Sequence, residues 1–412
     1  MKKIHGKMMK GITVKSLMML LALTGSNYCH AQQATIVVSN ATSAARTELI
    51  SLNMSEIKAK LGNAAPKKSE AFIVKNTRGQ QIGSQITHDG LLLIDASVRP
   101  HGSATYYVSI GKPYQQKVYA TGALYKIRKD DIAWENDRCA YRVYGPALQR
   151  TGERSFGTDI WVKNTPDTVV YERYIKDMNG NIKGDKMDAK VRDILTSFHL
   201  DHGNGLDPYR VGATLGLGAP SLMVGKNQVL PYCYKDYRIL DNGPLRFTVE
   251  LTYNPSTVGD MKNVVEHRII SLDKGSNFNK MTVWYDGLTT PTDFATGFPI
   301  HEEDTETKTF AKDYVSYADP TDNVEVNNSQ VFVGVLFPEG IDHTYYQLFD
   351  KKHDGATGHA LGLKRGLKNQ EKYSYYFGAA WSKYDVRSYA EWQIRIKDYL
   401  DALKNPLQVE IK

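Results

Sequence analysis

Cysteine is scarce in this chain, and the common catalytic sequence motifs are missing. The 412 residues include 3 Cys, and no two of them have the spacing of a zinc site. The sequence has no phosphate-binding Gly-Lys-Ser/Thr loop, dinucleotide-binding glycine fingerprint, Gly-x-Ser-x-Gly elbow or His-Glu-x-x-His motif. These absences argue against a nucleotide-binding protein and assign no cofactor. A divalent ion such as Ca²⁺ or Zn²⁺ stays open, because no ligand set requires one.

A long apolar run is also missing, and the short one present lies in a leader. The first residues hold five Lys and no acidic residue around the apolar run Ser16–Leu23, and a small residue follows at Ala31. This pattern is typical of a secretory signal peptide, residues 1–31, cut after Ala31. The run is shorter than the roughly 20 residues that span a bilayer. We expect an exported protein, periplasmic or extracellular, with no membrane insertion after signal cleavage. In that compartment Cys139 and Cys233 form either one disulfide or two buried thiols.

An excess of positive charge is absent once the leader is removed. The whole chain has 52 basic and 45 acidic residues, a net charge of +7. Without the five leader lysines, 47 basic residues remain against 45 acidic ones, a net charge of +2. Non-specific nucleic-acid binding requires a basic face that this balance does not supply. The 26 Tyr and 5 Trp suit surfaces that stack on sugar rings, and they also suit the core of a β-sandwich.

Short β-rich runs separated by turn residues dominate the chain. Convincing helical periodicity is limited to Asp188–Thr196 and Ser388–Leu403, and Met54–Leu61 is a candidate for a further short helix. This pattern predicts a mostly β fold, a large antiparallel β-sandwich with a few short helices. We expect a single large domain over residues 32–412, with a weak internal boundary near residues 111–117. The expected strands lie at Thr35–Ser39, Ala71–Lys75, Leu91–Ile94, Thr105–Ile110, Trp134–Tyr144, Phe156–Val162, Val169–Ile175, Leu245–Tyr253, Val264–Ile270, Phe278–Asp286, Val331–Phe337 and Tyr373–Trp381.

Polar and cationic residues alternate along the segment Glu135–Gly145. A continuous strand would place one set of side chains on a single face, namely Trp134, Asn136, Arg138, Arg142 and Tyr144. Each arginine fork could bind a carboxylate, and four residues of strand would separate the two forks by roughly 13 Å. Asn136, Arg138, Arg142 and Tyr144 are therefore candidate substrate contacts for acidic sugars. The alternative is a solvated sheet face with Arg138 paired to a structural acid such as Asp159.

The loop His199–Arg210 gathers two His, two Asp, a Tyr and an Arg. Loops rich in such groups are where function concentrates. A first interpretation is a metal site at His199, Asp201 and His202. A second has His202 or Tyr209 moving protons while Arg210 neutralises a substrate carboxylate, with Asp207 as a further substrate contact. A third is a loop held by Asx turns alone.

Two later segments add candidates. In Phe294–Glu303, alternation places His301 opposite Phe298 and Ile300, and a His at a strand end beside acids is a candidate base. In Tyr375–Tyr384, Trp381 and Tyr384 follow small residues that could leave room for a sugar ring. The alternative for His301 is a structural histidine. The alternative for Trp381 and Tyr384 is packing in the core.

The segments Glu135–Pro146, His199–Gly218, Phe294–His301 and Gly378–Trp392 together resemble a family of secreted bacterial proteins known as domain of unknown function 4861. The resemblance covers nearly the whole mature chain. It implies a large β-sandwich similar to galactose mutarotase and to the β domains of polysaccharide lyases, a supersandwich. It also implies an association with enzymes that degrade uronic-acid-containing polysaccharides such as pectin. The family has no established catalytic set to carry over.

The favoured hypothesis is an exported enzyme that acts on uronic-acid-containing, pectin-like glycans by β-elimination. Elimination requires a cation at the uronate carboxylate, a base for the C5 proton and an acid for the leaving oxygen. The cation would be one of the arginines named above, the base His202 or His301, and the acid Tyr209. Hydrolysis through Asp201, Asp207 or Glu302 is an alternative. So are a non-catalytic glycan-binding protein and a sugar mutarotase.

Overall fold

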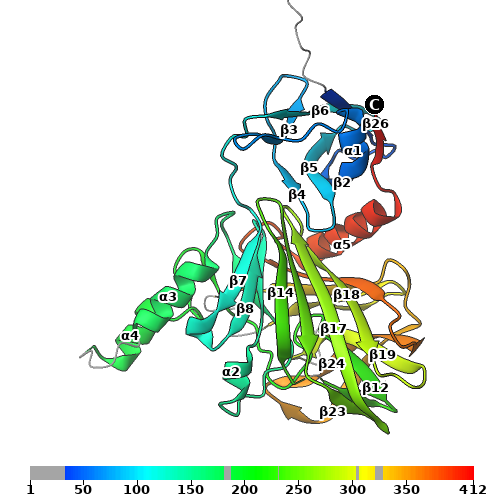
Figure 1. The fold of residues 1–412 in the computed structure, drawn as a ribbon. Coiled ribbons are helices and arrows are strands. Elements are labelled where there is room, and N and C mark those ends of the chain that lie inside the picture. The colour runs from blue at the N-terminus through cyan, green and yellow to red at the C-terminus, as the bar shows by residue number, and fades with distance from the viewer. Residues whose placement is uncertain (1–32, 181–186, 231, 303–305, 321–327) are drawn as a thin grey trace, which may run out of the picture.

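The chain folds mainly into antiparallel β-sheets (Figure 1). The computed structural model describes residues 33–412 except 181–186, 231, 303–305 and 321–327. The signal peptide expected at residues 1–31 lies outside these residues. The described strands form five sheets, and the helices are few and short, so the mostly β prediction is confirmed. No described helix is long and apolar enough to cross a membrane.

The larger part of the molecule, called here the main sandwich, is built on one long sheet. Facing it are two five-stranded sheets. Ile160, Val283 and Phe298, one from each of the three sheets, belong to the same buried cluster. Alternating inward side chains of facing sheets therefore form the core, as in other sandwiches.

The strand bounds of the main sandwich follow the order of each sheet. The long sheet runs β14 (Tyr234–Asn242), β15 (Arg246–Tyr253), β17 (Met261–Asp273), β18 (Phe278–Asp286), β25 (Tyr373–Trp381), β22 (Val331–Leu336), β21 (Tyr314–Asp319) and β20 (Lys308–Phe310), with β16 (Ser256–Val258) beside β17. One facing sheet runs β11 (Gly205–Leu206), β10 (Thr158–Lys163), β9 (Cys139–Val143), β8 (Asp131–Glu135) and β7 (Thr121–Tyr125). The other runs β13 (Asn227–Val229), β12 (Pro220–Val224), β19 (Thr292–Ile300), β24 (Ala356–Leu367) and β23 (His343–His353).

A smaller N-terminal lobe packs around a hydrophobic cluster of its own. Its two sheets are β26 (Gln408–Ile411), β1 (Gln33–Ser39), β6 (Ser103–Gly111) and β3 (Ala71–Asn76), and then β2 (Arg46–Asn53), β5 (Leu91–Val98) and β4 (Ser84–Ile86), with helix α1 (Met54–Lys60). The chain returns to this lobe through β26. The boundary expected near residues 111–117 falls between β6 and β7. The hydrophobic cluster of this lobe is separate from that of the main sandwich. That residues 32–412 form a single domain stays a prediction.

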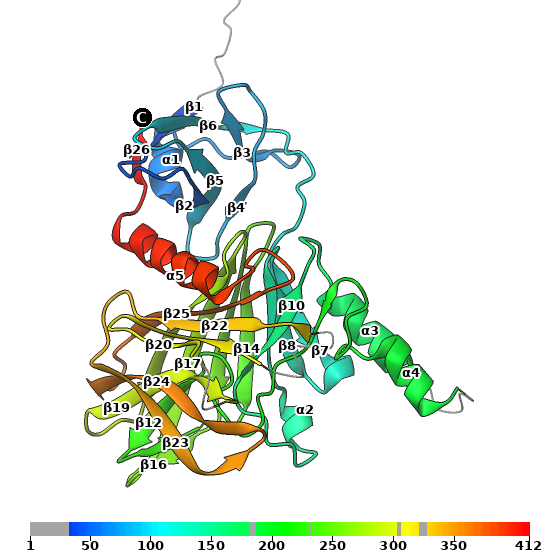
Figure 2. The ribbon, with the colours of Figure 1, turned by 180° about the vertical axis from the view of Figure 1, so that it is seen from behind.

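Polar contacts join the N-terminal lobe to the main sandwich. The side-chain oxygen of Gln85 accepts hydrogen bonds from the backbone N–H groups of Leu245 and Arg246 at 2.9 and 2.7 Å. The carboxylate of Asp241 accepts from the backbone N–H of His88 at 2.7 Å and lies 2.9 Å from its ring Nδ1. Helix α5 (Tyr389–Lys404) lies between the two parts in both Figures 1 and 2. These contacts fix the lobe against one end of the sandwich.

Helix α5 shows how capping and apolar periodicity fix a helix in this chain. Helix α5 begins after Ser388, whose side chain accepts from the backbone N–H of Glu391, and it buries Trp392 and Ile396. The helices expected at Met54–Leu61, Asp188–Thr196 and Ser388–Leu403 are confirmed as α1, α4 (Ala189–Thr196) and α5. The short helices η1 (Lys126–Arg128) and α2 (Pro146–Gln149) complete the set.

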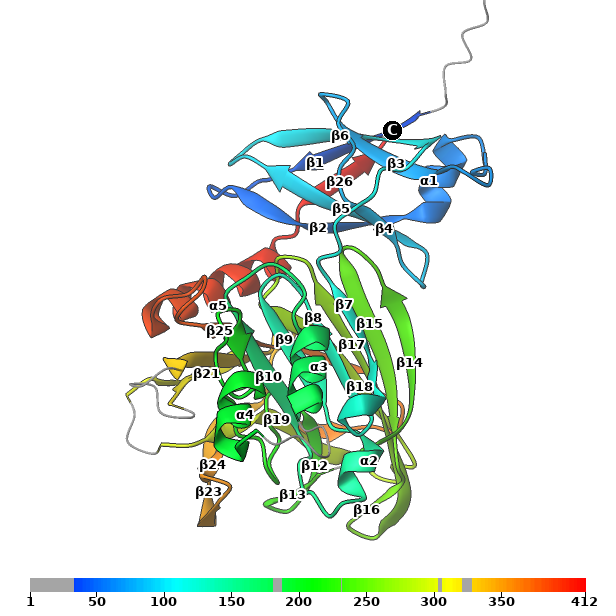
Figure 3. The ribbon, with the colours of Figure 1, turned by 90° about the vertical axis from the view of Figure 1, so that its left-hand side faces the viewer.

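The strand predicted at Val169–Ile175 is wrong, because helix α3 (Val170–Gly180) occupies this segment. The buried carboxylate of Glu135 accepts from the backbone N–H groups of Val169 and Val170 at 2.9 to 3.0 Å. A carboxylate at this position satisfies the free N–H groups of a helix start. Figure 3 shows α3 and α4 beside the sheet that contains β9 and β10. A cap supplied from a distant strand is not visible in the local sequence pattern.

The single strand predicted over Trp134–Tyr144 is also wrong. The segment forms β8 and β9, joined by a turn at residues 136–138. The side-chain oxygen of Asn136 accepts from the backbone N–H groups of Arg138 at 2.9 Å and Cys139 at 3.1 Å. The turn breaks the alternation, so Arg138 and Arg142 do not share a sheet face.

A charged pair lies in the centre of the main core. Glu266 and Arg268 both point inward from β17, and Arg268 is fully buried. Its Nε donates to Glu266 at 2.5 Å, and its guanidinium stacks on the ring of Tyr253 at 4.1 Å. Among the described residues, the two terminal nitrogens of Arg268 have no hydrogen-bond partner. Tyr285 donates its hydroxyl hydrogen to Glu266 at 2.8 Å.

We expect Glu266→Leu to lower the free energy of unfolding by about 3–5 kcal/mol, because it leaves Arg268 as an uncompensated buried charge. The double variant Glu266→Leu/Arg268→Met should recover most of this loss. Chemical denaturation of the three proteins measures both effects. A double variant no more stable than the single variant would contradict this account of the pair.

Candidate functional site

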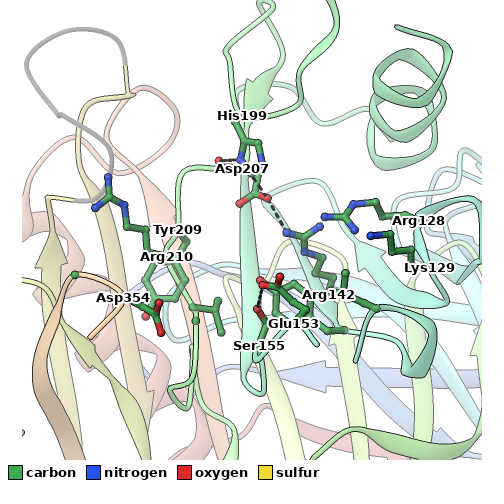
Figure 4. Close-up of a pocket in the computed structure, with 15 residues that line it drawn as sticks. Arg128, Lys129, Arg142, Glu153, Ser155, His199, Asp207, Tyr209, Arg210 and Asp354 are labelled. Atoms are coloured by element: carbon green, nitrogen blue, oxygen red, sulfur yellow. Dashed lines mark hydrogen bonds and ion pairs between the residues drawn. The ribbon is translucent and has the colours of Figure 1, made fainter. Parts of the chain in front are cut away.

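One open pocket of about 660 Å³ gathers much of the described polar chemistry of the main sandwich (Figure 4). It lies where the turn after β7, the end of β9, the segment after β11 and the turn between β23 and β24 meet. Of the residues expected in a site, Arg142, Tyr144, Asp207, Tyr209 and Arg210 line it. The remaining lining residues are Arg128, Lys129, Leu148, Glu153, Ser155, His199, Val211, Gly212, Asp354 and Gly355.

Arg142 lies beneath the pocket, and three carboxylates surround it. Its Nε donates to Asp159 at 2.6 Å, and its terminal nitrogens donate to Asp207 at 2.9 Å and Asp131 at 3.4 Å. All four side chains are buried. The guanidinium also lies over the rings of Tyr144 and other aromatic residues. The buried guanidinium of Arg142 thus holds Asp207 in place, its expected role as a substrate contact stays a prediction, and Asp159 pairs with Arg142 rather than Arg138.

The buried cluster holds one guanidinium against three carboxylates. Burial raises the pKa of Asp131, and the attraction of Arg142 and then Arg128 opposes this rise. The backbone N–H of Gly145 and the hydroxyl of Tyr174 also donate to Asp131, at 3.2 and 3.3 Å. A carboxyl group raised in this way is the one that most readily carries a proton in a crowded acidic cluster.

His199 lies at the mouth of the pocket and is linked to Asp207. Its ring Nδ1 lies 3.1 Å from the backbone oxygen of Asp207 and 3.7 Å from the carboxylate of the same residue. A carbonyl oxygen only accepts, so the contact at 3.1 Å assigns the hydrogen of the neutral ring to Nδ1 and leaves Nε2 with a free lone pair. The side chain is 58% exposed. His199 therefore has the tautomer and access of a general base, a role that the sequence had placed on His202.

Tyr209 forms part of the floor of the pocket, two residues after Asp207. It is 5% exposed, and its hydroxyl has no hydrogen-bond partner among the described residues. Burial raises the pKa of Tyr209 well above its usual value, and the negative charges of Asp319 and Asp159 add to the effect. The phenol is therefore protonated at neutral pH and can donate a hydrogen. The role of acid that the sequence suggested for Tyr209 stays a prediction.

His301 lies behind Tyr209 and does not line the pocket, and its expected role as a base stays a prediction. The two rings meet edge to face, with centroids 6.0 Å apart. The ring Nδ1 lies 2.9 Å from the carboxylate of Asp319. Burial opposes the charged form of His301, but the Asp319 carboxylate outweighs burial and raises the pKa of His301. His301 and Asp319 thus form a supporting pair next to Tyr209.

The turn between β7 and β8 carries two cations to the pocket. Lys129 and Asp130 both have left-handed backbone angles, with φ of 57° and 67°, which is strained for residues other than glycine. A side chain at Gly145 would collide with this backbone at about 2.2 Å, so only glycine fits there. The hydroxyl of Tyr234 donates to the backbone oxygen of Asp130 at 2.5 Å. Arg128 and Lys129 were not expected as site residues; the turn-forming Lys129-Asp130 pair between two β-rich runs is the sequence signal for this loop.

The remaining candidates lie outside the pocket, and each has a structural partner. His202 is exposed, and its Nε2 bonds the backbone oxygen of Ser197 at 2.9 Å. Asn136 is buried and donates to the backbone oxygens of Asp273 and Ser276. Arg138 pairs with Asp385 at 2.6 Å. Trp381 donates its ring N–H to the backbone oxygen of Asn328 at 2.6 Å. Tyr384 donates its hydroxyl hydrogen to the backbone oxygen of Asp137 at 3.2 Å. None of these five lines the pocket, and their expected roles in a site stay predictions.

The structure bears on the two cysteines and on the metal site suggested at His199, Asp201 and His202. Cys139 and Cys233 are both free and buried. Within the described part of the chain, no three His, Cys, Asp or Glu side chains come together as a metal-binding group. Asp201 accepts from the backbone N–H groups of Gly203 and Gly205 at 2.9 and 3.0 Å, which holds a turn in the manner typical of aspartate.

Fold and site together describe a β-sandwich protein with a cation-lined pocket at the loop ends. The chain belongs to the family described as a domain of unknown function, DUF4861, whose model matches residues 38–409. The resemblance inferred from the sequence is thereby confirmed. An uncharacterised protein P7 from Formosa agariphila is 26% identical over 336 residues, 78% of each chain.

Two solved structures from Enterococcus faecalis are similar to this chain. One is a protein in the glycosyl hydrolase family 38, with a TM-score of 0.50 at 9% identity, covering 92% of this chain and 47% of that one. The other is an alpha-mannosidase, with a TM-score of 0.48 at 8% identity, covering 92% and 46%. This chain spans about half the length of each. At such low identity the likeness concerns the fold.

We expect the stability contributed by His301 to depend on pH in a defined direction. Its raised pKa means that the protonated ring stabilises the fold fully below the unfolded value of about 6.5, and this contribution is lost as pH rises through the folded value. The Tm of wild type should therefore exceed that of His301→Gln most at about pH 6, and the difference should shrink toward about pH 9.

Thermal unfolding across this pH range measures the effect. The control variant His202→Gln, which changes an exposed histidine outside the pocket, should stay close to wild type in Tm. A difference between wild type and His301→Gln that is constant or grows with pH would contradict the assigned pair with Asp319.

Proposed function

We propose that this protein is an exported carbohydrate-active enzyme that cleaves uronate-containing, pectin-like glycans by β-elimination. The observation that carries the proposal is the placement of His199, Tyr209 and Arg210 around one pocket. One segment supplies a base with a free ring nitrogen, a protonated buried phenol and a guanidinium. These are the three functions that elimination next to a carboxylate requires.

Each residue has a role in the reaction. Arg210 neutralises the uronate carboxylate, which makes the proton on the adjacent C5 easier to remove. Nε2 of His199 takes that proton, and the electron pair left on C5 forms the C4–C5 double bond. The bond from C4 to the glycosidic oxygen breaks, and the Tyr209 hydroxyl donates its hydrogen to the departing oxygen. The products are an unsaturated uronate and a new free end, so atoms and charge balance.

Asp207 and Arg142 hold this arrangement together. The backbone oxygen of Asp207 fixes the tautomer of His199, while its carboxylate is held by Arg142 at 2.9 Å. Histidine bases in enzymes are commonly oriented in this way through their second ring nitrogen. Arg142 is therefore a positioning residue that acts through Asp207.

Three further observations support the wider proposal. The likeness in fold to a protein in the glycosyl hydrolase family 38 favours a carbohydrate-active protein. The basic, apolar leader favours export. Cations at the pocket favour an acidic substrate over a neutral one.

Hydrolysis receives less support from the same pocket. It requires two carboxyl groups across the scissile bond. Among the lining acids, Asp207 is engaged by Arg142, and Asp354 accepts from the backbone N–H of Ala213 at 3.0 Å. Glu153 accepts the hydroxyl hydrogen of Ser155 at 2.8 Å. No described pair of lining acids is free to take the two roles.

The test is incubation of the mature protein with a panel of uronate-containing polysaccharides and oligosaccharides, following the absorbance of unsaturated uronates together with reducing ends. Wild type should raise both signals. Tyr209→Phe and His199→Gln should each lower kcat by about 100-fold or more, the usual range for loss of a general acid or base. His202→Gln, a histidine three residues from His199 and outside the pocket, should retain wild-type kcat.

The alternative outcomes are distinct. Reducing ends without unsaturated products would indicate hydrolysis and overturn elimination. Binding without either signal would indicate a glycan-binding protein. Loss of activity in His202→Gln, with His199→Gln active, would reverse the assignment of the base.

A further inference from the structure

The pocket has a second group of cations that the proposed elimination does not use. Arg128 and Lys129 line the pocket from the turn between β7 and β8. In Figure 4 they lie on one side of His199 and Asp207, and Arg210 lies on the other side. Elimination requires one cation at one carboxylate. Positive groups on two opposite walls point to a ligand with more than one negative group.

Arg128 is held in place without using its hydrogen-bond donors. Its guanidinium lies over the ring of Phe198 at 5.7 Å, a contact that fixes the plane of the group. It forms no hydrogen bond with any other residue in the described part of the chain. Arg142 lies over the same ring at 5.6 Å, yet its donors are taken by three carboxylates. Arg128 thus keeps its planar fork available to a ligand, a geometry that matches a carboxylate or sulfate.

The backbone that carries Arg128 is rigid. The two left-handed residues that follow it, Lys129 and Asp130, are strained, and such strain persists only where the surroundings enforce it. The enforcing contacts are the close approach of Gly145, the bond from Tyr234 to the Asp130 oxygen, and the bond from the Leu148 backbone N–H to the Lys129 oxygen at 3.2 Å. A pre-ordered turn loses little entropy when a ligand binds.

We propose that Arg128 and Lys129 form a second anion subsite, so that the ligand is a glycan segment with negative groups on two sugar units. Resting on the proposed function, the unit at Arg210 is the uronate that undergoes elimination, and the unit at Arg128 carries a second carboxylate or a sulfate ester. A pocket of about 660 Å³ lies in the size range that accepts ligands larger than one sugar ring. Arg128 is the specificity-determining residue of this subsite.

The test compares affinities for oligosaccharides of equal length that differ in their negative groups. The probes are α-1,4-linked digalacturonate, the same disaccharide with one carboxylate as its methyl ester, and a disaccharide with one uronate and one sulfate ester. Glucuronate-containing disaccharides with one and two carboxylates extend the panel. Calorimetric titrations use a Tyr209→Phe background, in which cleavage of the probes is slowed. Lys126→Gln is the matched control, because it removes one positive charge two residues from Arg128 on an exposed side chain that does not line the pocket.

We expect Arg128→Gln to weaken binding of the doubly charged probes about tenfold, a loss of about 1.4 kcal/mol, and to leave the affinity for the singly charged probes unchanged. Arg128→Lys keeps the charge and loses the planar fork. Its affinity for the doubly charged probes should lie between those of wild type and Arg128→Gln. Lys126→Gln should change neither affinity. If Arg128→Gln also weakens binding of the sulfated probe, sulfate is an accepted second group. If it weakens binding of the dicarboxylates alone, the second group is a carboxylate.

Other outcomes would overturn the subsite. Equal weakening of both probe classes by Arg128→Gln, or an equal effect of Lys126→Gln, would indicate general electrostatic attraction. Absence of preference for two charges over one, or absence of binding by any doubly charged probe, would also overturn it. Selective binding without any unsaturated product from the protein with Tyr209 intact would retain the subsite and reject elimination, so the two proposals fail separately.

Discussion

The buried guanidinium of Arg142 is the contact on which the pocket depends. It joins Asp131 at the start of β8, Asp159 in β10 and Asp207 in the segment after β11. The two strands that flank β9 and the segment after β11 therefore converge on one group. Breaking a buried pair of this kind is costly, because the surviving charges have no water to replace the lost partner. The position of Asp207, and through it that of His199, follows from this arrangement.

The pocket has cations at its wall and the acidic cluster beneath it. Three carboxylates around one guanidinium leave an excess of negative charge inside the protein. Burial raises the pKa of Asp131, which favours a protonated form, and Arg128 lies near enough to interact with the same carboxyl group. Arg142 pairs with all three acids, and Arg128 and Lys129 line the pocket beside them.

The sequence predicted the architecture well because the signals for it are local. The strands at Phe278–Asp286 and Tyr373–Trp381 match β18 and β25 residue for residue, since alternating apolar residues fix them. The errors arose where a distant partner decided the structure. Glu135 caps α3 from another strand and turned an expected strand into a helix. Asn136 folds its side chain onto the following N–H groups and replaced an expected strand with a hairpin turn.

The candidate site shows the same division between local and distant information. The loop His199–Arg210 was recognised from its composition, and Asp207, Tyr209 and Arg210 do line the pocket. Composition alone did not distinguish His199 from His202, because each ring is oriented by its partner. The Asp207 oxygen holds one ring at the pocket, and the Ser197 oxygen holds the other outside it. Arg128 was missed altogether, since it reaches the pocket through a hairpin about 70 residues earlier in the chain.

This separation along the chain has a functional consequence. His199, Tyr209 and Arg210 stand on one segment anchored by Arg142, so the proposed base, acid and carboxylate contact move together. Arg128 and Lys129 stand on a different hairpin, held by Gly145 and Tyr234. A change in the β7–β8 turn can alter which negative groups are recognised without displacing the groups that act on the bond. A change at Arg142 would disturb the groups that act on the bond, because it would displace Asp207 and change the orientation of His199. Recognition of the second sugar and chemistry on the first are thus carried by separate structural elements that meet in one pocket.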